Sequence, residues 1–543
     1  MTTGLHERRR MVKRLCQCMG LASLILVVNY GDLLGGGADV RMHVPYPLTG
    51  ICLANIADIL LLGAGLFAVF ALTARTRFYS WMRLLVAVLA PPYLLERTRT
   101  VTPFEMTDGV ILICGVVWAA LLLLLLLRFP LVYRRVLRVG DAIGVFLAVF
   151  GLCSILQLLW VMTWRPGPRQ ITAAWSNRAP APRAHPRVVW VLFDELSYDQ
   201  VFAHRAHDLA LPNFDALKAE STVYTDMQPV GLKTVKIIPS LLSGAVVDDF
   251  RYGFDNTFKV HYAGTHGWRQ LDGDGTIFHD AQQAGWRTAV VGWYNPYCSM
   301  YRSALDSCYW TNFDRTDGDM AQRYSLWRNT ARPFQGLGLQ LVSPELADRR
   351  SCDFDVRQRL QTYINLQQHA SDLLKDDRSD LVFLHLPIPH SPNIWSRVKD
   401  TFARGCGSSY LDNLALADRT LGSMMQILQQ SPRWKDTTVI VQGDHSWRVM
   451  LWDWLPAWTD EDDQASNDEF DPRPALVIHN AGQTQAATDG RALSLLFVHD
   501  ALESVLHGEP VPVAPPGQAA SPGAEHHAVA VSEKGVPSSW SLY

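Results

Sequence analysis

The feature that most constrains this chain is the concentration of its long apolar segments in the first third of 543 residues. Five segments approach the roughly 20 residues that a helix needs to cross a bilayer. They run approximately from Leu15 to Leu34, Leu48 to Leu72, Trp81 to Leu95, Val110 to Leu127 and Ala142 to Met162. A cleavable signal peptide would explain only the first of them. We therefore predict a five-helix transmembrane domain over residues 1–165.

Basic residues predict the orientation of this domain. They gather in "ERRRMVKR" before the first span, "TARTRFYSWMR" after the second and "RFPLVYRRVLRVG" before the fifth. The positive-inside rule makes these segments cytoplasmic. Everything after the fifth span is then on the periplasmic or extracellular side of a multi-pass inner (cell) membrane protein. The loop "ERTRTVTPFEMTD" carries two arginines and is a mild exception.

The remainder of the chain has the composition of a soluble α/β domain. Apolar runs such as "VVWVLF", "RTAVVGW", "LVFLHL", "TTVIVQG" and "PALVIHN" alternate with helical patterns such as "YLDNLALADRTLGSMMQILQQ". This alternation predicts a mixed, mostly parallel central sheet. We expect a linker over 166–187, a catalytic-type domain over 188–512 and a disordered Pro- and Ala-rich tail over 513–543. The formal net charge of -3 gives no indication of nucleic acid as a partner.

Four cysteines lie in the outer domain: Cys298, Cys308, Cys352 and Cys406. An even number of cysteines in an oxidising compartment favours disulfide bonds. Cys298 and Cys308 form the more natural pair because they close a short loop, and buried free thiols are the alternative.

Potential metal ligands follow three of the predicted strands. The residues are Asp194 and Glu195, His385 and His390, and Asp444 and His445. In open α/β sheets, functional groups gather at the carboxyl ends of the strands. Any one group alone is explained by a hydrogen-bonded turn, but together they predict one divalent cation. We favour zinc, with manganese, calcium or magnesium as alternatives.

A candidate nucleophile lies in "GLKTVKIIPSLLSG". Thr234 precedes a short predicted helix, whose unpaired N–H groups favour an anion. A threonine hydroxyl becomes a useful nucleophile only beside a metal or a base. The alternative is that Thr234 only caps the helix.

In their order along the chain, these motifs resemble those of the sulfatase-like branch of the alkaline phosphatase superfamily. By architecture they are most similar to membrane phosphoethanolamine and phosphoglycerol transferases of the lipoteichoic acid synthase type. The resemblance covers roughly residues 188–483 and includes "FDE", "TVKIIPSLLSG", "HLPIPHSP" and "VIVQGDHS". It implies catalytic roles for Thr234 and His390. The implied metal ligands are Asp194, Glu195, Thr234, Asp444 and His445, and the implied substrate contacts are His390, His385 and Arg448.

Two departures from the sulfatase pattern matter. Sulfatases carry Cys or Ser in a Cys-x-Pro-x-Arg type signature, whereas this chain has Thr234, Lys236 and Ile238 at the corresponding positions. Sulfatase activity is therefore not expected, and a threonine matches the transferases. Where sulfatases carry a lysine and a histidine after the "AVVGW" strand, this chain reads "YNPYC". The leaving-group side of the site is thus unassigned.

Three functional hypotheses follow. The first is metal-dependent transfer of a phosphoethanolamine or phosphoglycerol unit from a membrane phospholipid to an envelope glycan or lipid, through a phosphothreonine. The second is a membrane-anchored phosphodiesterase, phosphatase or sulfatase-type hydrolase that uses water as the acceptor. The third is a catalytically inactive protein of envelope assembly. The loops that would decide between acceptors, such as Asn312 to Phe354, give no interpretable pattern.

Overall fold

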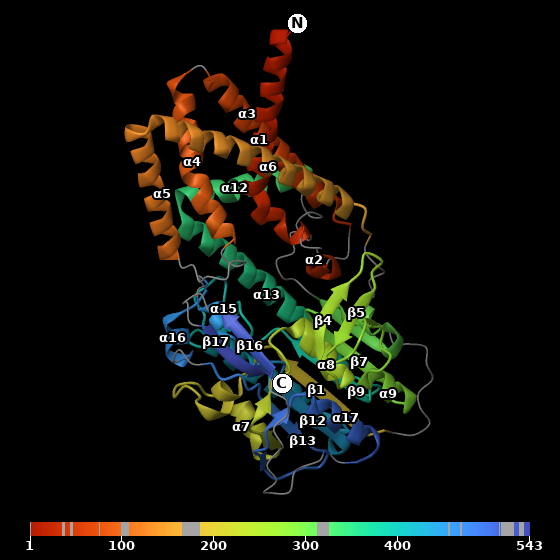
Figure 1. Ribbon diagram of the computed structural model, residues 1–543. Helices are drawn as coiled ribbons and strands as arrows, with labels where there is room; N and C mark the ends of the chain where they lie inside the picture. Colours follow the sequence, from red (N-terminus) through yellow and green to blue (C-terminus); the bar gives the residue numbers. More distant parts are fainter. Residues whose placement is uncertain are drawn as a thin grey trace.

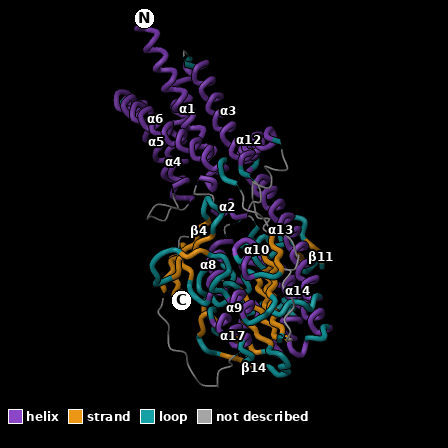
Figure 2. The backbone as a smooth tube through the Cα atoms, turned by 90° about the vertical axis from the view of Figure 1, so that its right-hand side faces the viewer, coloured by secondary structure: helices purple, strands orange, loops and turns teal. Residues whose placement is uncertain are grey.

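The computed structural model describes residues 2–34, 38–43, 47–74, 76–98, 108–165, 185–311, 325–453, 455, 457–466, 470–509, 511, 526–531 and 537–542. A group of long helices from the first third of the chain stands above an α/β domain, and α13 runs from one to the other (Figures 1 and 2). The first helices are α1 (Thr2–Leu34), α2 (Ala38–His43), α3 (Thr49–Thr73), α4 (Arg77–Thr98), α5 (Asp108–Arg128) and α6 (Pro130–Val161).

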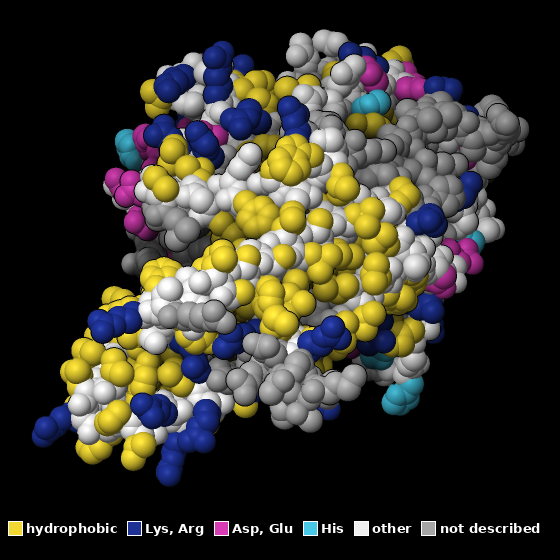
Figure 3. Space-filling view, turned by 90° about the horizontal axis from the view of Figure 1, so that it is seen from above, with side chains coloured by type: hydrophobic (Ala, Val, Ile, Leu, Met, Phe, Trp, Pro, Cys, Tyr) yellow, Lys and Arg dark blue, Asp and Glu magenta, His cyan; other side chains and the backbone are white. Residues whose placement is uncertain are grey.

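Helices occupy all five positions predicted to span a membrane, but fewer than five meet the requirements of a span. Within the described residues, three helices are long and apolar enough: Thr49–Thr73, Val110–Arg128 and Pro130–Val161. Helix α1 begins with a charged run. Helix α4 carries internal arginines and Pro91 and Pro92, which shorten its apolar stretch. Seen from above, apolar side chains cover much of this end of the molecule (Figure 3).

Helix α1 packs closely against α3 and α6. At Gly20 the backbones of α1 and α6 are so close that a Cβ would lie 2.4 Å from the carbonyl carbon of Leu147. A glycine at this position therefore permits the contact.

The α/β domain is built around a mixed sheet, as predicted. Among the described residues the sheet has eight strands in the order β14-β2-β13-β12-β1-β9-β7-β8. The strands from β12 to β8 are parallel, and β13 is antiparallel to both of its neighbours. Their bounds are β1 Arg187–Phe193, β2 Thr222–Tyr224, β7 Thr288–Trp293, β8 Ser307–Thr311, β9 Leu381–Leu386, β12 Thr437–Gly443, β13 Leu476–His479 and β14 Ala487–Asp489.

Both faces of this sheet are covered by helices, so its central strands are buried throughout. Alternate residues of β1 belong to two cores, with Trp190 on one face and Val191 on the other. The first face carries α8 (Thr234–Ser243), α9 (Ile277–Gln283) and α17 (Phe497–Leu506). The second carries α7 (Pro212–Ala219), α13 (Pro344–Lys375) and α14 (Tyr410–Gln430). Two-sided burial explains why these strands are uninterrupted apolar runs in the sequence.

Apart from α12, the remaining elements are short. The other helices are α10 (Tyr297–Met300), α12 (Leu326–Val342), α15 (Val449–Trp452), α16 (Asp460–Ser466), η2 (Asp199–Ala203), η3 (Arg302–Ala304) and η4 (Trp434–Asp436). The other strands are β3 (Met227–Gln228), β4 (Val247–Tyr252), β5 (Phe258–Tyr262), β6 (Arg269–Gln270), β10 (Trp395–Ser396), β11 (Thr401–Phe402), β15 (Leu493–Ser494), β16 (His526–Val531) and β17 (Pro537–Leu542).

Three segments differ from the sequence-based expectation or fall outside the described residues. Residues 325–354, expected to be loop, belong mostly to α12 and the start of α13, and α12 packs against α3. Most of the predicted linker lies outside the described residues, as do 513–525, 532–536 and 543 of the predicted tail. Among the described residues of that tail, strands β16 and β17 pair antiparallel.

The structure pairs all four cysteines of the outer domain. Cys298 is bonded to Cys308, which links α10 to β8, and Cys352 is bonded to Cys406, which links α13 to the segment before α14. The short-loop pair is the one that the sequence favours.

Candidate metal and catalytic site

The site forms where two adjacent parallel strands end together. Strands β1 and β12 pair in register to their last residues, Phe193 and Gly443. The next residues, Asp194 and Asp444, therefore leave the sheet side by side. Both are fully buried.

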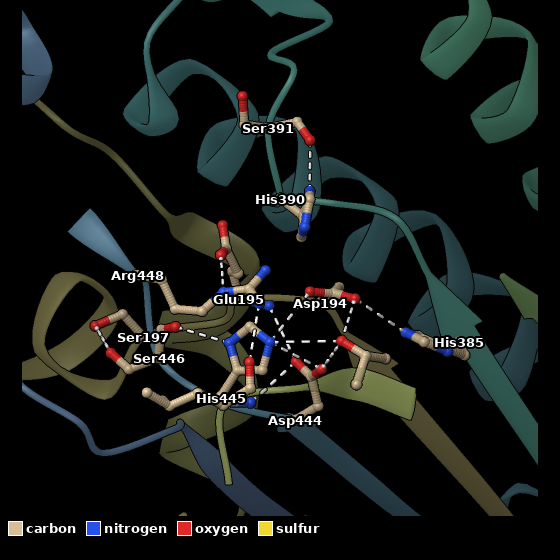
Figure 4. A network of polar contacts seen from close by, with 12 residues as sticks. Asp194, Glu195, Ser197, His385, His390, Ser391, Asp444, His445, Ser446 and Arg448 are labelled. Atoms are coloured by element: carbon tan, nitrogen blue, oxygen red, sulfur yellow. Dashed lines mark hydrogen bonds and ion pairs between the residues drawn. The ribbon is translucent and has the colours of Figure 1, made fainter. Parts of the chain in front are cut away.

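Three side chains at this edge are arranged to bind a cation. Ligand atoms of Asp194, Asp444 and His445 all lie within 4.8 Å of one another. The Nε2 atom of His445 is 3.2 Å from Oδ2 of Asp444 and 3.7 Å from Oδ1 of Asp194. Figure 4 shows these side chains pointing toward one another, with His385 to one side and His390 above.

The chemistry of this cluster fits a divalent metal ion. Burial, and then the neighbouring carboxylate of Asp444, raise the pKa of Asp194 well above its usual value. The Oδ1 atom of Asp194 is buried and has no hydrogen-bond partner among the described residues. Burial and the cation of Arg448 lower the pKa of His445 to about 3, so its imidazole is neutral at physiological pH and can ligate a metal. Two buried carboxylates and a neutral imidazole form a set that a cation would stabilise.

Thr234 lies beside this cluster as the first residue of α8. Its hydroxyl donates to Oδ2 of Asp444 at 2.7 Å and lies 3.3 Å from Oδ2 of Asp194. It is also 3.5 Å from Nε2 of His445. Lys233 occupies the cap position of α8. The hydroxyl of Thr234 therefore faces the candidate metal ligands and does not serve as a helix cap.

Glu195 is not part of the three-residue cluster, although the sequence assigns it to the metal. Its carboxylate accepts hydrogen bonds from Nε of Arg448 at 2.7 Å and from Nε1 of Trp452 at 2.8 Å. The backbone of Glu195 has φ of 67°, in the left-handed region that few non-glycine residues adopt. Arg448, for which the resemblance implies a substrate contact, is ion-paired with Glu195.

The two predicted histidines lie on different sides of the cluster (Figure 4). His385 Nε2 is 3.5 Å from Oδ2 of Asp194, and its Nδ1 is 2.6 Å from the hydroxyl of Tyr297. Burial lowers the pKa of His385 to about 4. Burial, followed by the positive charges of Arg359 and Arg448, lowers the pKa of His390 well below its ordinary value.

Several residues at the site carry no signal in the sequence. The Arg359 side chain from α13 is 2% exposed, stacks 4.2 Å from the ring of Trp293 and donates to the carbonyl of Ser391 at 3.0 Å. The rings of Trp293 and Trp452 lie 5.2 and 5.0 Å from that of His390. An arginine within a helix and isolated tryptophans are common features, so only the tertiary structure reveals their positions.

The sulfatase family model matches residues 186–491. A phosphonate monoester hydrolase of Agrobacterium radiobacter is 14% identical with a TM-score of 0.39, and the alignment covers 60% of this chain and 74% of that one. An alkaline phosphatase superfamily protein from Vibrio parahaemolyticus is 16% identical, with coverage of 64% and 69% and a TM-score of 0.35.

Murine ectonucleotide pyrophosphatase/phosphodiesterase 5, in an inactive form with AMP, is 11% identical. Its alignment covers 62% of this chain and 98% of the murine chain, with a TM-score of 0.35. A comparison with curated protein sequences found no match.

Proposed function

Because this chain belongs to the sulfatase family, we propose that it is a metal-dependent membrane enzyme that transfers a phospholipid headgroup phosphoryl unit to an envelope glycan or lipid. The family and the Asp-Asp-His cluster support a hydrolase-type enzyme with a divalent cation. The proposal goes further in three respects. The reaction is a transfer, the transferred headgroup is phosphoethanolamine or phosphoglycerol, and the acceptor is an envelope glycan or lipid.

The observation that carries this proposal is the position of the Thr234 hydroxyl, 2.7 Å from Asp444 and 3.3 Å from Asp194. These carboxylates are placed to accept the hydroxyl proton as its oxygen attacks phosphorus. The Oγ–P bond forms, the bond from phosphorus to the diacylglycerol oxygen breaks, and that oxygen takes a proton. The acceptor hydroxyl then attacks the phosphothreonine, and Thr234 is regenerated with its proton.

Other residues support the charge that develops on the phosphoryl oxygens. A bound divalent cation would lower the pKa of the Thr234 hydroxyl and neutralise part of this charge. The first N–H groups of α8 favour an anion at the same point. His390 and the buried cation Arg359 provide further donors near the site.

The membrane helices give the proposed donor a route to the site. The Arg41 guanidinium of α2 donates to the carbonyls of Tyr252 and Gly253 on β4 and just beyond it, so α2 and the α/β domain share one side of the membrane. The intervening helices α3 to α6 must then cross an even number of times. We propose that α4 crosses together with α3, α5 and α6, and that the site faces the periplasm or cell exterior.

Mass spectrometry of Thr234 in the intact protein, purified from membranes, tests the proposal. We expect an adduct with the mass of phosphoethanolamine or phosphoglycerol that is absent from Thr234→Ala. An unmodified Thr234 in metal-loaded protein, with label from a phospholipid donor released to water, would replace transfer with hydrolysis. An unmodified Thr234 with no bound metal would favour the non-catalytic hypothesis.

A further inference from the structure

Helix α2 lies between α1 and the candidate span α3 in the sequence and rests on the α/β domain. It lies between the long helices and β4 in both views of the backbone (Figures 1 and 2). The Arg41 guanidinium donates to the carbonyls of Tyr252 and Gly253, both at 3.3 Å. The ring of His43, the last residue of α2, lies 4.7 Å from the ring of Tyr294. A segment of the membrane domain is thus held against the domain that carries the candidate site.

The run Trp293–Asn295 connects α2 to the candidate nucleophile. It begins at the last residue of β7, the strand after which the sulfatase pattern is lost. The ring of Trp293 is 5.2 Å from that of His390. The Asn295 amide donates to the backbone carbonyl of Thr234 at 3.5 Å. Tyr294, between these two residues, is the one that contacts His43.

Two buried acceptors flank Tyr294. His43 is 6% exposed, and its imidazole is hydrogen-bonded to the backbone of Tyr294 through one nitrogen. Burial lowers the pKa of His43 to about 3, so the ring is neutral. Its Nε2 atom and the Oδ1 atom of the fully buried Asn295 have no hydrogen-bond partner among the described residues. Leaving buried acceptors unpaired is unfavourable, so a ligand that donates hydrogen bonds would be favoured here.

We propose that His43 and Asn295 bind the headgroup of the donor phospholipid, and that this headgroup carries O–H or N–H donors. This inference rests on the proposed function and specifies its substrate class. A hydroxyl or a primary ammonium can donate to Nε2 and Oδ1, whereas a trimethylammonium group cannot. Asn295 lies in the run that replaces the lysine and histidine which sulfatases carry after this strand. His43 contacts the same run at Tyr294, so α2 borders the side of the site that the sequence leaves unassigned.

The test measures binding without turnover. The full-length Thr234→Ala protein in detergent is titrated calorimetrically with dihexanoyl phosphatidylethanolamine, phosphatidylglycerol and phosphatidylcholine. We expect at least one of the first two to bind about tenfold more tightly than phosphatidylcholine, as one or two added hydrogen bonds would give. Whichever binds more tightly distinguishes an ammonium from a hydroxyl headgroup. Addition of His43→Ala should remove the preference while phosphatidylcholine binding stays the same.

Matched variants make the result specific. His43→Gln keeps an acceptor oxygen and should retain part of the headgroup preference. If His43→Ala does not fold, the His43→Gln variant tests the role of His43 in its place. His261→Ala removes a histidine of β5 that is ion-paired with Asp248, and it should change nothing. Equal binding of the three lipids, or an equal loss for all three in His43→Ala, overturns the inference.

This experiment is separate from the test of transfer. If the headgroup preference depends on His43 but Thr234 never forms an adduct, the headgroup site is supported and transfer is contradicted. If Thr234 forms an adduct but the protein shows no headgroup preference, the headgroup site is contradicted and transfer is supported.

Discussion

The metal side of the candidate site and its membrane side are assembled in different ways. On the metal side, Asp194 and Asp444 follow adjacent parallel strands whose register extends to the last residue of each. On the membrane side, His43 meets Tyr294 through packing between a membrane-domain segment and a loop some 250 positions away in the sequence. The first arrangement follows from strand pairing, and the second depends on how two domains dock.

This difference predicts how the two sides respond to mutation. Changes on the metal side should affect every substrate, because the candidate nucleophile and the candidate cation would act in any phosphoryl transfer. Changes on the membrane side should affect only substrates that arrive from the bilayer. This distinction would be contradicted by a metal-side variant that affects lipid and soluble substrates differently. It would also be contradicted by a membrane-side variant that affects both equally.

The largest effect is expected for Thr234→Ala. Removing the nucleophile should lower the rate at least about 10⁴-fold, both with a phospholipid donor and with soluble bis(p-nitrophenyl) phosphate. Steady-state rates in nanodiscs measure both. Thr265→Ala removes an exposed threonine hydroxyl and should leave both rates unchanged. Substantial residual activity of Thr234→Ala on either substrate would show that another group is the nucleophile.

The next effect concerns Glu195, which the sequence assigns to the metal and the structure pairs with Arg448. Glu195→Gln leaves a buried guanidinium without its carboxylate, so the free energy of unfolding should fall by about 3–5 kcal/mol. Metal content, measured by mass spectrometry of the folded protein, should stay at that of the wild type. Loss of the metal without loss of stability would show that Glu195 is a metal ligand.

A smaller effect, with an unusual sign, is expected for Asp444→Asn. Without metal, two buried carboxylates repel each other, and this repulsion contributes to the raised pKa of Asp194. In chelator the variant should therefore be more stable than the wild type, by on the order of 1 kcal/mol. On addition of zinc or manganese only the wild type should gain stability. Thermal unfolding with and without metal measures this, and a variant that is less stable in chelator contradicts it.

The sequence predicts the metal side well because its signals are local. Apolar runs that end in Asp, Glu or His specify both a buried strand and the edge where its side chains emerge. The α/β fold and mixed sheet are confirmed on this basis. Glu195 shows the limit of such reasoning, because its carboxylate pairs with Arg448 and Trp452, and no local sequence pattern specifies these contacts.

The membrane side was not predictable in the same way. Helices α12 and α13 fall partly in a stretch without interpretable pattern, and Arg359 and Trp293 meet only after α13 has packed on the sheet. The number of spans was overestimated because apolar content was counted without the charges and prolines inside α1 and α4. Contacts of this kind depend on the relative placement of elements, which composition and periodicity do not specify.

The smallest expected effect tests the surface of α12, which packs against the candidate span α3 and exposes apolar side chains. Val342 of α12 is 85% exposed, and Val398, between β10 and β11, is 92% exposed. If α12 lies along the bilayer, Val342→Asp places a charge at its boundary, at a cost of about 1 kcal/mol, below the roughly 2.5–3.5 kcal/mol of the bilayer centre. The phospholipid-donor rate in nanodiscs should fall about fivefold. Val398→Asp should change neither that rate nor the soluble one. If both variants change the phospholipid-donor rate equally, α12 does not lie along the bilayer. The membrane side of the site is then formed by α2 without α12.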